Sequence, residues 1–579
     1  MKINNMNRFQ MNPVNLDISR SRIKKPFGTK ITLNSGKLVP FYVKEIVPGE
    51  TLKLDYASVI RSITPAAPVM DNSFIDFYFF WVPHRLSTIG EKDWQKVCGE
   101  NVAGYWAPNT ESTLINTNNS YNIKDLNVSS LGSTSFKVAP QSLLDYLGIA
   151  VLPASRVGTG SGNSSGVINT LASRAYFKIW NEFFRDENTQ PVLTLDMSKA
   201  GLTDTDSNSQ VLPVNRFHDY FCSVLPAPQK GSSVLLPLGT YAPVYAGLEH
   251  DRNNAGLILR PTGNTPVRQL PDGDGVVPLL VGDEDEGTYA FKTSGATESE
   301  PSGATVSYKG YLEPVNLYTD LSAATAASVN ELRNAFAIQR LLEKDARGGT
   351  RYFETLLAHF NVTNPDLVLQ RPEYLSGKRV PLNITQVNQT SETSSDSPLG
   401  ATGAFSDTAT SDYAFTKSFG EYGYVIGVCC IRTSQSYSQG IPKHFQKTSR
   451  FHYYWPVFAN LGEMPVLKKE LYFGQSSSDN DAVFGYQEAW ADYRYRYNSV
   501  HGYFNPDAGD TFLTAWTYTN NFNTYPTLNS DFMKQPKSLI DDTLAYKDSP
   551  YQFYMDLYFE EVDTLPMPLY SIPGLIDHH

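Results

Sequence analysis

The sequence predicts a mainly β protein with a packed β-sandwich as its core, and three observations carry this prediction. Six aromatic residues lie within the eight positions from Phe74 to Trp81, a density that favours a strand over the competing possibility of a buried helix. Helical patterns occur at only a few places along the 579 residues. The predicted strands do not alternate with helices, which argues against a parallel α/β fold.

The stretch Val69–Leu86, VMDNSFIDFYFFWVPHRL, is expected to be the central strand. Because side chains alternate along a strand, one face would carry Phe74, Asp76, Tyr78 and Phe80, and the other Ile75, Phe77, Phe79 and Trp81. Both faces are mostly apolar, so the strand needs a covering layer on each side. Pro83 lacks a backbone donor and is expected to end the strand.

The remaining elements are predicted to pack around this strand. Two or three strands are expected between Thr29 and Arg61, where apolar residues alternate and Val47-Pro48-Gly49 supplies a turn. Later strands are predicted over Val211–Leu225, Tyr422–Arg432, Arg450–Phe458 and Met555–Val562. Helices are predicted over Ala139–Leu147, Val167–Asp186, Ser328–Gly348 and Thr350–Phe360. The glycine-rich run Gly158–Gly166 matches neither common phosphate-binding spacing and is interpreted as a linker.

Composition indicates a subunit that buries much of its outer surface as well as its core. Only 18% of the residues are charged, while 35 Tyr and 31 Phe are present. Aromatic side chains are enriched at protein interfaces, although an aromatic-rich carbohydrate-binding adhesin would have a similar composition. The net charge of −11 argues against wholesale wrapping of nucleic acid, which needs clustered Lys and Arg.

Cysteine usage and hydropathy favour a protein that is made in the cytoplasm and stays there, or that becomes part of an assembly formed there. The four cysteines are few and irregularly spaced, so we interpret them as reduced core thiols. Cys429 and Cys430 would point to opposite faces of one strand, which argues against a shared metal ion. The first 30 residues lack the apolar core of a secretory signal, and no apolar run reaches the length of a membrane helix, so no membrane insertion is expected.

Two basic stretches are candidate contacts with nucleic acid. Residues 1–30 hold seven Lys and Arg against Asp17 alone and are predicted to form a basic N-terminal arm. The arm is either solvated or in contact with nucleic acid or a neighbouring subunit, and its candidate residues are Arg20, Arg22, Lys24 and Lys25. In FGYQEAWADYRYRY, Phe484–Tyr497, an extended backbone would place Arg494 and Arg496 on one face and tyrosine rings on the other. Such a row suits single-stranded nucleic acid, and pairing with acids of a neighbouring subunit is the plainer alternative.

Residues 228–314 are predicted to form a large surface insertion. They are rich in Gly, Pro, Ser and Thr, and the length far exceeds that of ordinary connections. The candidate packing residues are Val276, Val277, Leu279, Leu280 and Val281. The candidate acidic tip is Asp283, Glu284, Asp285 and Glu286, which lacks EF-hand spacing and is interpreted as solvated rather than Ca²⁺-binding.

No pattern of residues indicates catalysis or a cofactor. The nine histidines form no HxH or HExxH set, there is no GxSxG elbow, and adjacent carboxylates such as Glu560-Glu561 would face away from each other on a strand. The sequence therefore predicts a protein that is not an enzyme.

Several long segments resemble the major capsid protein of the gokushovirus branch of the microviruses. They run in order from the N-terminus to the last residue: ISRSRIKKPFGTKIT, VPFYVKEIVPGETLKLD, VMDNSFIDFYFFWVPHRL, DWQKVCGEN, RYFETLLAHFNVTNPDLVLQRPEYL, FGYQEAWADYRYRYNSV and LYSIPGLIDHH. Their length and order make the resemblance cover nearly the whole chain.

The resemblance implies an eight-stranded antiparallel jelly roll with long inserted loops, a single capsid domain over residues 31–579. It implies sixty copies in a T=1 icosahedral shell around circular single-stranded DNA, assembled in the bacterial cytoplasm. It also implies a small basic DNA-binding packaging protein and internal scaffolding or pilot proteins as partners. The insertion is expected to protrude at threefold axes, and from its composition and length we expect it to meet a host surface receptor.

Overall fold

The computed structural model describes residues 19–87, 140–151, 167–193, 210–234, 329–362, 369–393, 399–400, 402–509 and 511–570, with short strand segments at 120–122, 244–246, 258–262, 277–278, 311–314 and 317–319. The chain divides into two compact units. The main unit comprises Met1–Lys230 and Lys344–His579, and the inserted unit comprises Gly231–Glu343.

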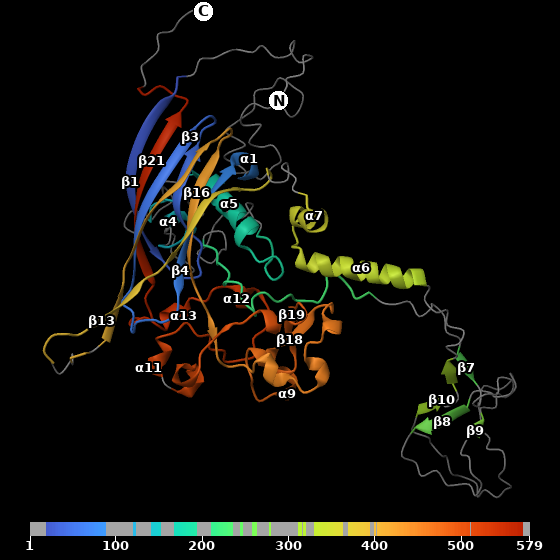
Figure 1. The fold of residues 1–579 in the computed structure, drawn as a ribbon. Helices are drawn as coiled ribbons and strands as arrows, with labels where there is room; N and C mark the ends of the chain where they lie inside the picture. The colour runs from blue at the N-terminus through green and yellow to red at the C-terminus, as the bar shows by residue number, and fades with distance from the viewer. Residues whose placement is uncertain are drawn as a thin grey trace, which may run out of the picture. The chain divides into compact units, whose positions relative to one another are not determined.

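Eight strands of the main unit form two four-stranded antiparallel sheets (Figure 1). The first sheet has the order β1-β21-β3-β15, and the second sheet has the order β12-β4-β16-β2. Their bounds are β1 (Ser21–Leu33), β2 (Val39–Ile46), β3 (Thr51–Ser62), β4 (Ser73–Pro83), β12 (Glu373–Pro381), β15 (Thr408–Ser418), β16 (Gly423–Thr433) and β21 (Phe553–Leu565). The prediction of a mainly β protein is confirmed.

Strand β4 is covered on both faces, as the alternation of its apolar residues predicts. Ile75, Phe77 and Phe79 lie in a core to which both sheets contribute, where Phe77 contacts Tyr56 of β3 at 5.4 Å between ring centroids. Phe80 lies in a second core, on the other face of the second sheet, together with residues of helix α5 (Leu171–Ile179). The two faces of β4 therefore pack in two different hydrophobic cores.

The side chains of the neighbouring strand β16 are divided between the same two cores. The buried thiols of Cys429 and Cys430 belong to the first and second cores respectively, and neither forms a disulfide. Burial in apolar surroundings raises the pKa of both thiols, so they remain protonated packing groups. The predicted opposite orientation of the pair is confirmed.

Helices are few and mostly short within the part of the chain that the structure describes. The longer ones match the predicted helical segments, and Asn361 ends α7 in the left-handed conformation. Besides α5, the helical elements are α1 (His84–Ser87), α4 (Leu143–Tyr146), the π-helical turn η4 (Trp180–Phe184), α6 (Val329–Arg347), α7 (Tyr352–Phe360), α9 (Ser477–Asn480), α10 (Ala491–Arg494), α11 (Thr511–Thr514), α12 (Ser530–Met533) and α13 (Ser538–Asp541).

Two predicted strands are wrong. Arg450–Phe458 forms the 3-10 turns η7 (Arg450–His452) and η8 (Pro456–Phe458), because Pro456 starts a turn and cannot donate to a ladder. Val211–Leu225 forms only isolated bridges, such as Leu225 with Tyr486, and Pro213 interrupts its donors.

Short elements complete the described chain. The remaining 3-10 turns are η6 (Lys443–Gln446), η9 (Lys468–Glu470), η10 (Gly502–Phe504) and η11 (Pro506–Ala508). The remaining strands of the main unit are β5 (Ser120–Asn122), β6 (Val167–Asn169), β13 (Ile384–Asn388), β14 (Thr402–Ser406), β17 (Ser436–Tyr437), β18 (Met464–Leu467), β19 (Val483–Gln487) and β20 (Asn498–Ser499).

The inserted unit contains strand pairs of its own. Its strands are β7 (Val244–Ala246), β8 (Ile258–Thr262), β9 (Val277–Pro278), β10 (Tyr311–Pro314) and β11 (Leu317–Thr319), in the orders β10-β8-β9 and β11-β7. The unit ends within α6, whereas the sequence predicted an insertion over residues 228–314.

Candidate functional site

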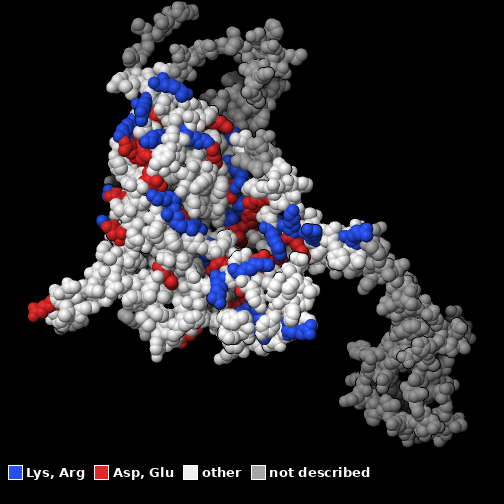
Figure 2. Space-filling model, in the orientation of Figure 1, with Lys and Arg blue, Asp and Glu red and all other residues white. Residues whose placement is uncertain are grey.

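The basic N-terminal candidates lie at the start of an edge strand. β1 pairs with β21 along its whole length, so Lys24 stands opposite Val562 and Lys25 opposite Glu561. The ammonium of Lys24 forms an ion pair with Glu560. Figure 2 shows acidic and basic side chains close together along the edge where Figure 1 places β1. Within the part of the chain that the structure describes, Arg20 and Arg22 form no ion pair.

Lys25 reaches into a buried charge cluster that sequence analysis missed. Its ammonium lies 2.6 Å from Asp563, whose side chain is fully buried. The ammonium of Lys44 contacts Asp563, Glu561 at 2.6 Å and Glu50 at 2.9 Å. Burial acts to raise the pKa of Asp563, but hydrogen bonds from the two lysines outweigh it and hold that pKa below its usual value. Lys25 is therefore already used inside the fold.

Arg494 and Arg496 line a cavity of about 1400 Å³ in the main unit. The extended row expected over Phe484–Tyr497 is wrong, because β19 ends at Gln487 and α10 occupies Ala491–Arg494. Arg494 donates to the carbonyl of Ala489 at 3.0 Å and lies 3.1 Å from Glu488. Arg496 is exposed and forms no ion pair within the described residues.

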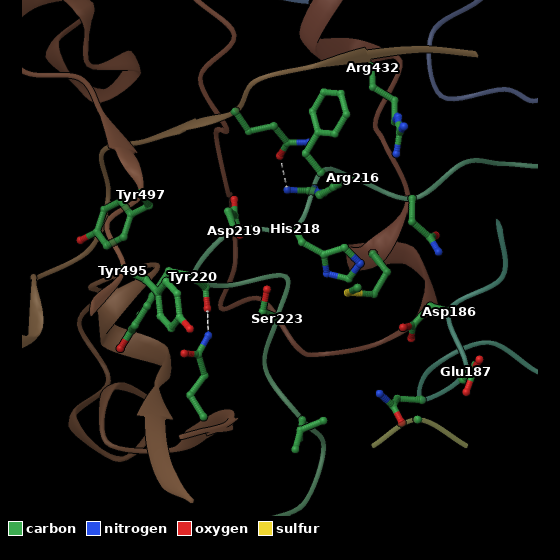
Figure 3. Close-up of a pocket in the computed structure, with 18 of the residues that line it drawn as sticks. Asp186, Glu187, Arg216, His218, Asp219, Tyr220, Ser223, Arg432, Tyr495 and Tyr497 are labelled. Carbon is green, nitrogen blue, oxygen red and sulfur yellow. Dashed lines mark hydrogen bonds between the residues drawn. The ribbon is translucent and has the colours of Figure 1, made fainter. Parts of the chain in front are cut away.

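The cavity is lined by both signs of charge. Figure 3 shows Tyr495 and Tyr497 on one side and Asp186 and Glu187 on the other. The lining arginines are Arg185, Arg216, Arg347, Arg379, Arg432, Arg494 and Arg496, and the lining acids are Asp186, Glu187, Asp219, Glu354, Glu463 and Glu488. The charges nearly balance, so the cavity as a whole does not form a polyanion site.

Two of these arginines are held by one buried carboxylate of the central strand. Arg379 stands opposite Asp76 in the register and donates to it from Nε at 2.6 Å, while Arg432 of β16 contacts the same carboxylate. The ring of Phe217 contacts both guanidinium groups, with its centroid 4.5 Å from the guanidinium carbon of Arg379 and 4.4 Å from that of Arg432. A buried carboxylate on the mostly apolar strand β4 is thus neutralised by its neighbours.

Ser223, His218 and Asp219 also line the cavity, but they do not form a catalytic set. The Asp219 carboxylate accepts hydrogen bonds from the backbone of Phe221 and Cys222 and from the hydroxyl of Tyr437 at 2.7 Å. The two backbone bonds close a local turn, and the bond from Tyr437 ties that turn to a distant segment of the chain. No group of His, Cys, Asp or Glu side chains in the described ranges is arranged to hold a metal ion.

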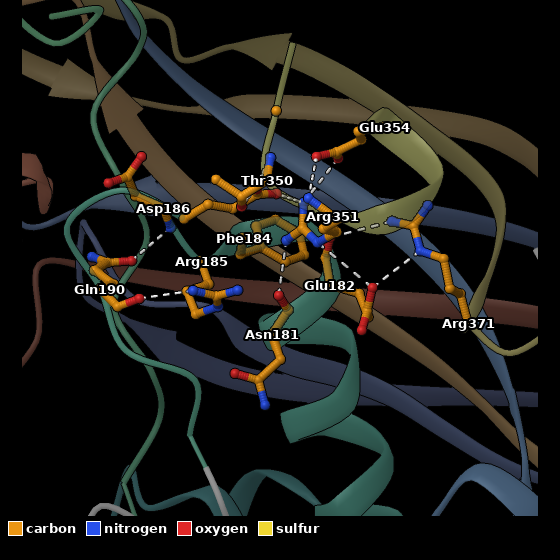
Figure 4. Close-up of polar contacts among 12 residues, drawn as sticks. Asn181, Glu182, Phe184, Arg185, Asp186, Gln190, Thr350, Arg351, Glu354 and Arg371 are labelled. Atoms are coloured by element: carbon orange, nitrogen blue, oxygen red, sulfur yellow. Dashed lines mark hydrogen bonds and ion pairs between the residues drawn. The ribbon is translucent and has the colours of Figure 1, made fainter. Parts of the chain in front are cut away.

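A polar anchor adjoins the cavity where the chain returns from the inserted unit. Arg351 lies at its centre, 3.1 Å from Glu354, and pairs with Glu187 (Figure 4). Arg371 donates to Glu182 at 3.1 Å, and its guanidinium lies 4.0 Å from the ring of Phe353. The anchor fixes α7 on the π-helical turn η4 that follows α5.

Most of the candidates in the insertion lie outside the described residues. These are Val276, Leu279, Leu280 and Val281, and the acidic residues Asp283, Glu284, Asp285 and Glu286. The backbone of Val277 belongs to β9, where it pairs with Leu259 of β8.

Sequence comparison shows the family of this chain. The family model described as "Capsid protein (F protein)" matches residues 13–575. The chain belongs to this family of phage capsid proteins. It is therefore a structural protein of a phage virion and not an enzyme, and the family implies assembly with further copies.

Three relatives extend the similarity of this capsid protein over nearly its full length. The "Capsid protein VP1" of Bdellovibrio phage phiMH2K is 34% identical, covering 96% of this chain and 95% of the relative. That of Spiroplasma virus 4 is 35% identical, covering 96% of each. That of Chlamydia phage 1 is 34% identical, covering 98% of each. The resemblance to gokushovirus capsid proteins is confirmed.

No described helix of the capsid protein has the length and apolarity needed to cross a bilayer.

Proposed function

We propose that sixty copies of this capsid protein form a T=1 icosahedral shell around circular single-stranded DNA. The observation that carries the proposal is the match to capsid proteins over nearly the full length of the chain. The aromatic composition and low charge fit a subunit with extensive interfaces.

The eight long strands are proposed to form a jelly roll. Successive strands alternate between the sheets except at one step: β1, β3, β15 and β21 lie in the first sheet, and β2, β4, β12 and β16 lie in the second, so β4 and β12 share a sheet. Pairing of β1 with the last strand, β21, then places the two ends of the domain side by side. This order supports a double-sheet Greek-key arrangement in which both sheets share one core.

Further partners are proposed for the surfaces that the fold leaves free. Arg20 and Arg22 are proposed to face the packaged DNA or a small basic packaging protein, with Arg494 and Arg496 as weaker candidates. Internal scaffolding or pilot proteins would act during assembly in the bacterial cytoplasm. The insertion over residues 228–314, with Val276–Val281 packing around a threefold axis, is proposed to meet a host receptor.

Electron microscopy of the purified protein, alone and from phage particles, tests this proposal. The expected result is closed shells of uniform size, with DNA in those recovered from infected cells. A protein that remains a monomer or trimer under all conditions and binds glycan would reject the shell and favour a carbohydrate-binding adhesin.

A further inference from the structure

A cluster of large apolar side chains lies exposed on the main unit, in the segment that runs from η6 to just before β18. We name this cluster the aromatic shelf; its members are Phe445, Phe451, Tyr453, Tyr454, Trp455, Val457 and Leu461. Val457 is 90% exposed and Phe445 is 73% exposed. Single exposed apolar residues are ordinary on a protein surface, but seven within seventeen positions are an unusual concentration.

The shelf is held in a defined shape although it is exposed. The indole nitrogen of Trp455 donates to the carbonyl of Arg450 at 3.0 Å. The indole nitrogen of Trp490 donates to the carbonyl of Phe458 at 2.8 Å, and the ring of Tyr454 packs edge-on against Trp490 at 5.6 Å. These contacts order the backbone in advance, which lowers the entropy cost of binding a partner.

The size of the shelf fits a protein interface. Aromatic side chains offer roughly 150–250 Å² each, so the exposed fractions of the seven residues amount to on the order of 800 Å². This summed area is about what one partner contributes to a standard interface.

The paired lysines and the aliphatic members of the shelf favour a protein partner over a nucleic acid. No Asp or Glu occurs between Tyr422 and Gly462. The positive charge of Lys447 is instead balanced by a residue outside this segment, because its ammonium lies 2.7 Å from Asp492. The same ammonium lies 4.0 Å from the ring of Tyr493. Lys443 lies 3.9 Å from Glu470. Val457 and Leu461 offer no ring on which a base could stack, so an apolar protein face is the better match.

We infer that the aromatic shelf is a contact surface for a second copy of this chain in the assembled shell. The inference rests on the proposed shell, since the family implies assembly with further copies and the shelf supplies the apolar area that such a contact needs. The copy is expected to meet it with a face that is mainly apolar, because a charged face would lose its hydration against the rings.

Thiol labelling of Val457→Cys tests the inference without relying on failed assembly. The described cysteines Cys222, Cys429 and Cys430 are buried, so the labelling of the unsubstituted protein provides the background. A small maleimide should modify the introduced thiol in dissociated subunits, and the rate should fall by about tenfold or more in empty shells. An unchanged rate in empty shells would overturn the inference, and protection seen only in DNA-filled particles would assign the shelf to nucleic acid instead.

A second test uses the double substitution Phe445→Asp with Val457→Asp. Both side chains point to solvent in the isolated subunit, so it should keep its circular dichroism spectrum and melting temperature while shell formation is lost. The matched control is Leu399→Asp, at a residue that is 64% exposed in a turn outside the shelf, and shells should form. Normal shells from the double variant would refute the inference, whereas the absence of shells from the unsubstituted protein would refute the proposed function itself.

Discussion

Lys44→Met is the substitution that tests the interior of the capsid protein most directly. The ammonium of Lys44 lies 2.9 Å from Glu50 and 2.6 Å from Glu561, and it also contacts Asp563. The side chains of these three acids are at most 6% exposed. Methionine keeps most of the length of the lysine stem, so the substitution removes the charge with little change in packing.

The expected cost is large because the carboxylates stay behind. After the substitution Lys25 is the cation among the described residues that still pairs with two of these acids, 2.6 Å from Asp563 and 3.7 Å from Glu561. Removing one partner of a buried ion pair costs about 3–5 kcal/mol, since the other charge is left without compensation. We expect the free energy of unfolding of the main unit to fall by about that amount at neutral pH.

The pH dependence supplies a second check. In the native protein the two lysines hold the pKa of Asp563 below its usual value. Ionised Asp563 therefore stabilises the fold fully at pH values above its unfolded pKa of about 3.9. This stabilisation is lost as the pH falls through the lower pKa of the folded state. Without Lys44, the pKa values of Asp563 and Glu561 should rise. The destabilisation should therefore be largest at neutral pH and shrink as the pH falls toward about 5.

Thermal and guanidinium unfolding at about pH 7.5 and about pH 5.5 would measure both effects. The matched control is Lys53→Met on β3, because Lys53 is half exposed and pairs with Asp55 at 3.0 Å. Such a surface pair contributes at most about 1 kcal/mol. A Lys44→Met protein that is no less stable than the Lys53→Met protein, or one whose loss of stability does not shrink in acid, would contradict a role for Lys44 in neutralising the buried carboxylates.

Three further predictions concern the surface and the core. Replacing Arg20 and Arg22 by Ser should lower the DNA content of particles more than Lys24→Ser, because Lys24 is paired with Glu560; equal genome content in all variants would reject a DNA contact. Phe77→Ala, at a fully buried position, should destabilise the main unit by about 3–5 kcal/mol in chemical unfolding, and a change below about 1 kcal/mol would contradict the two-sheet core. Shortening residues 228–314 to a Gly-Ser linker should leave shells intact while adsorption to host cells falls, so normal adsorption would place attachment elsewhere.

The local pattern of the sequence was enough to predict the central strand and both of its buried faces. Phe77 and Phe80 are an odd number of positions apart, so the alternation of side chains along a strand places them on opposite faces. This alternation depends on neighbouring residues and needs no knowledge of the rest of the chain. The opposite orientation of Cys429 and Cys430 follows from the same rule. Family membership was also readable, because the resembling segments are long and keep their order.

What only the tertiary structure decided is which distant charges meet. Lys44 and Glu561 are 517 positions apart, and no local pattern encodes the register that pairs β1 with β21. That register neutralises Lys24 and Lys25, which look free in a basic stretch of sequence. In the same way, the expected row of Arg494 and Arg496 was lost because a helical turn interrupts the strand, and backbone direction at such a turn depends on long-range packing.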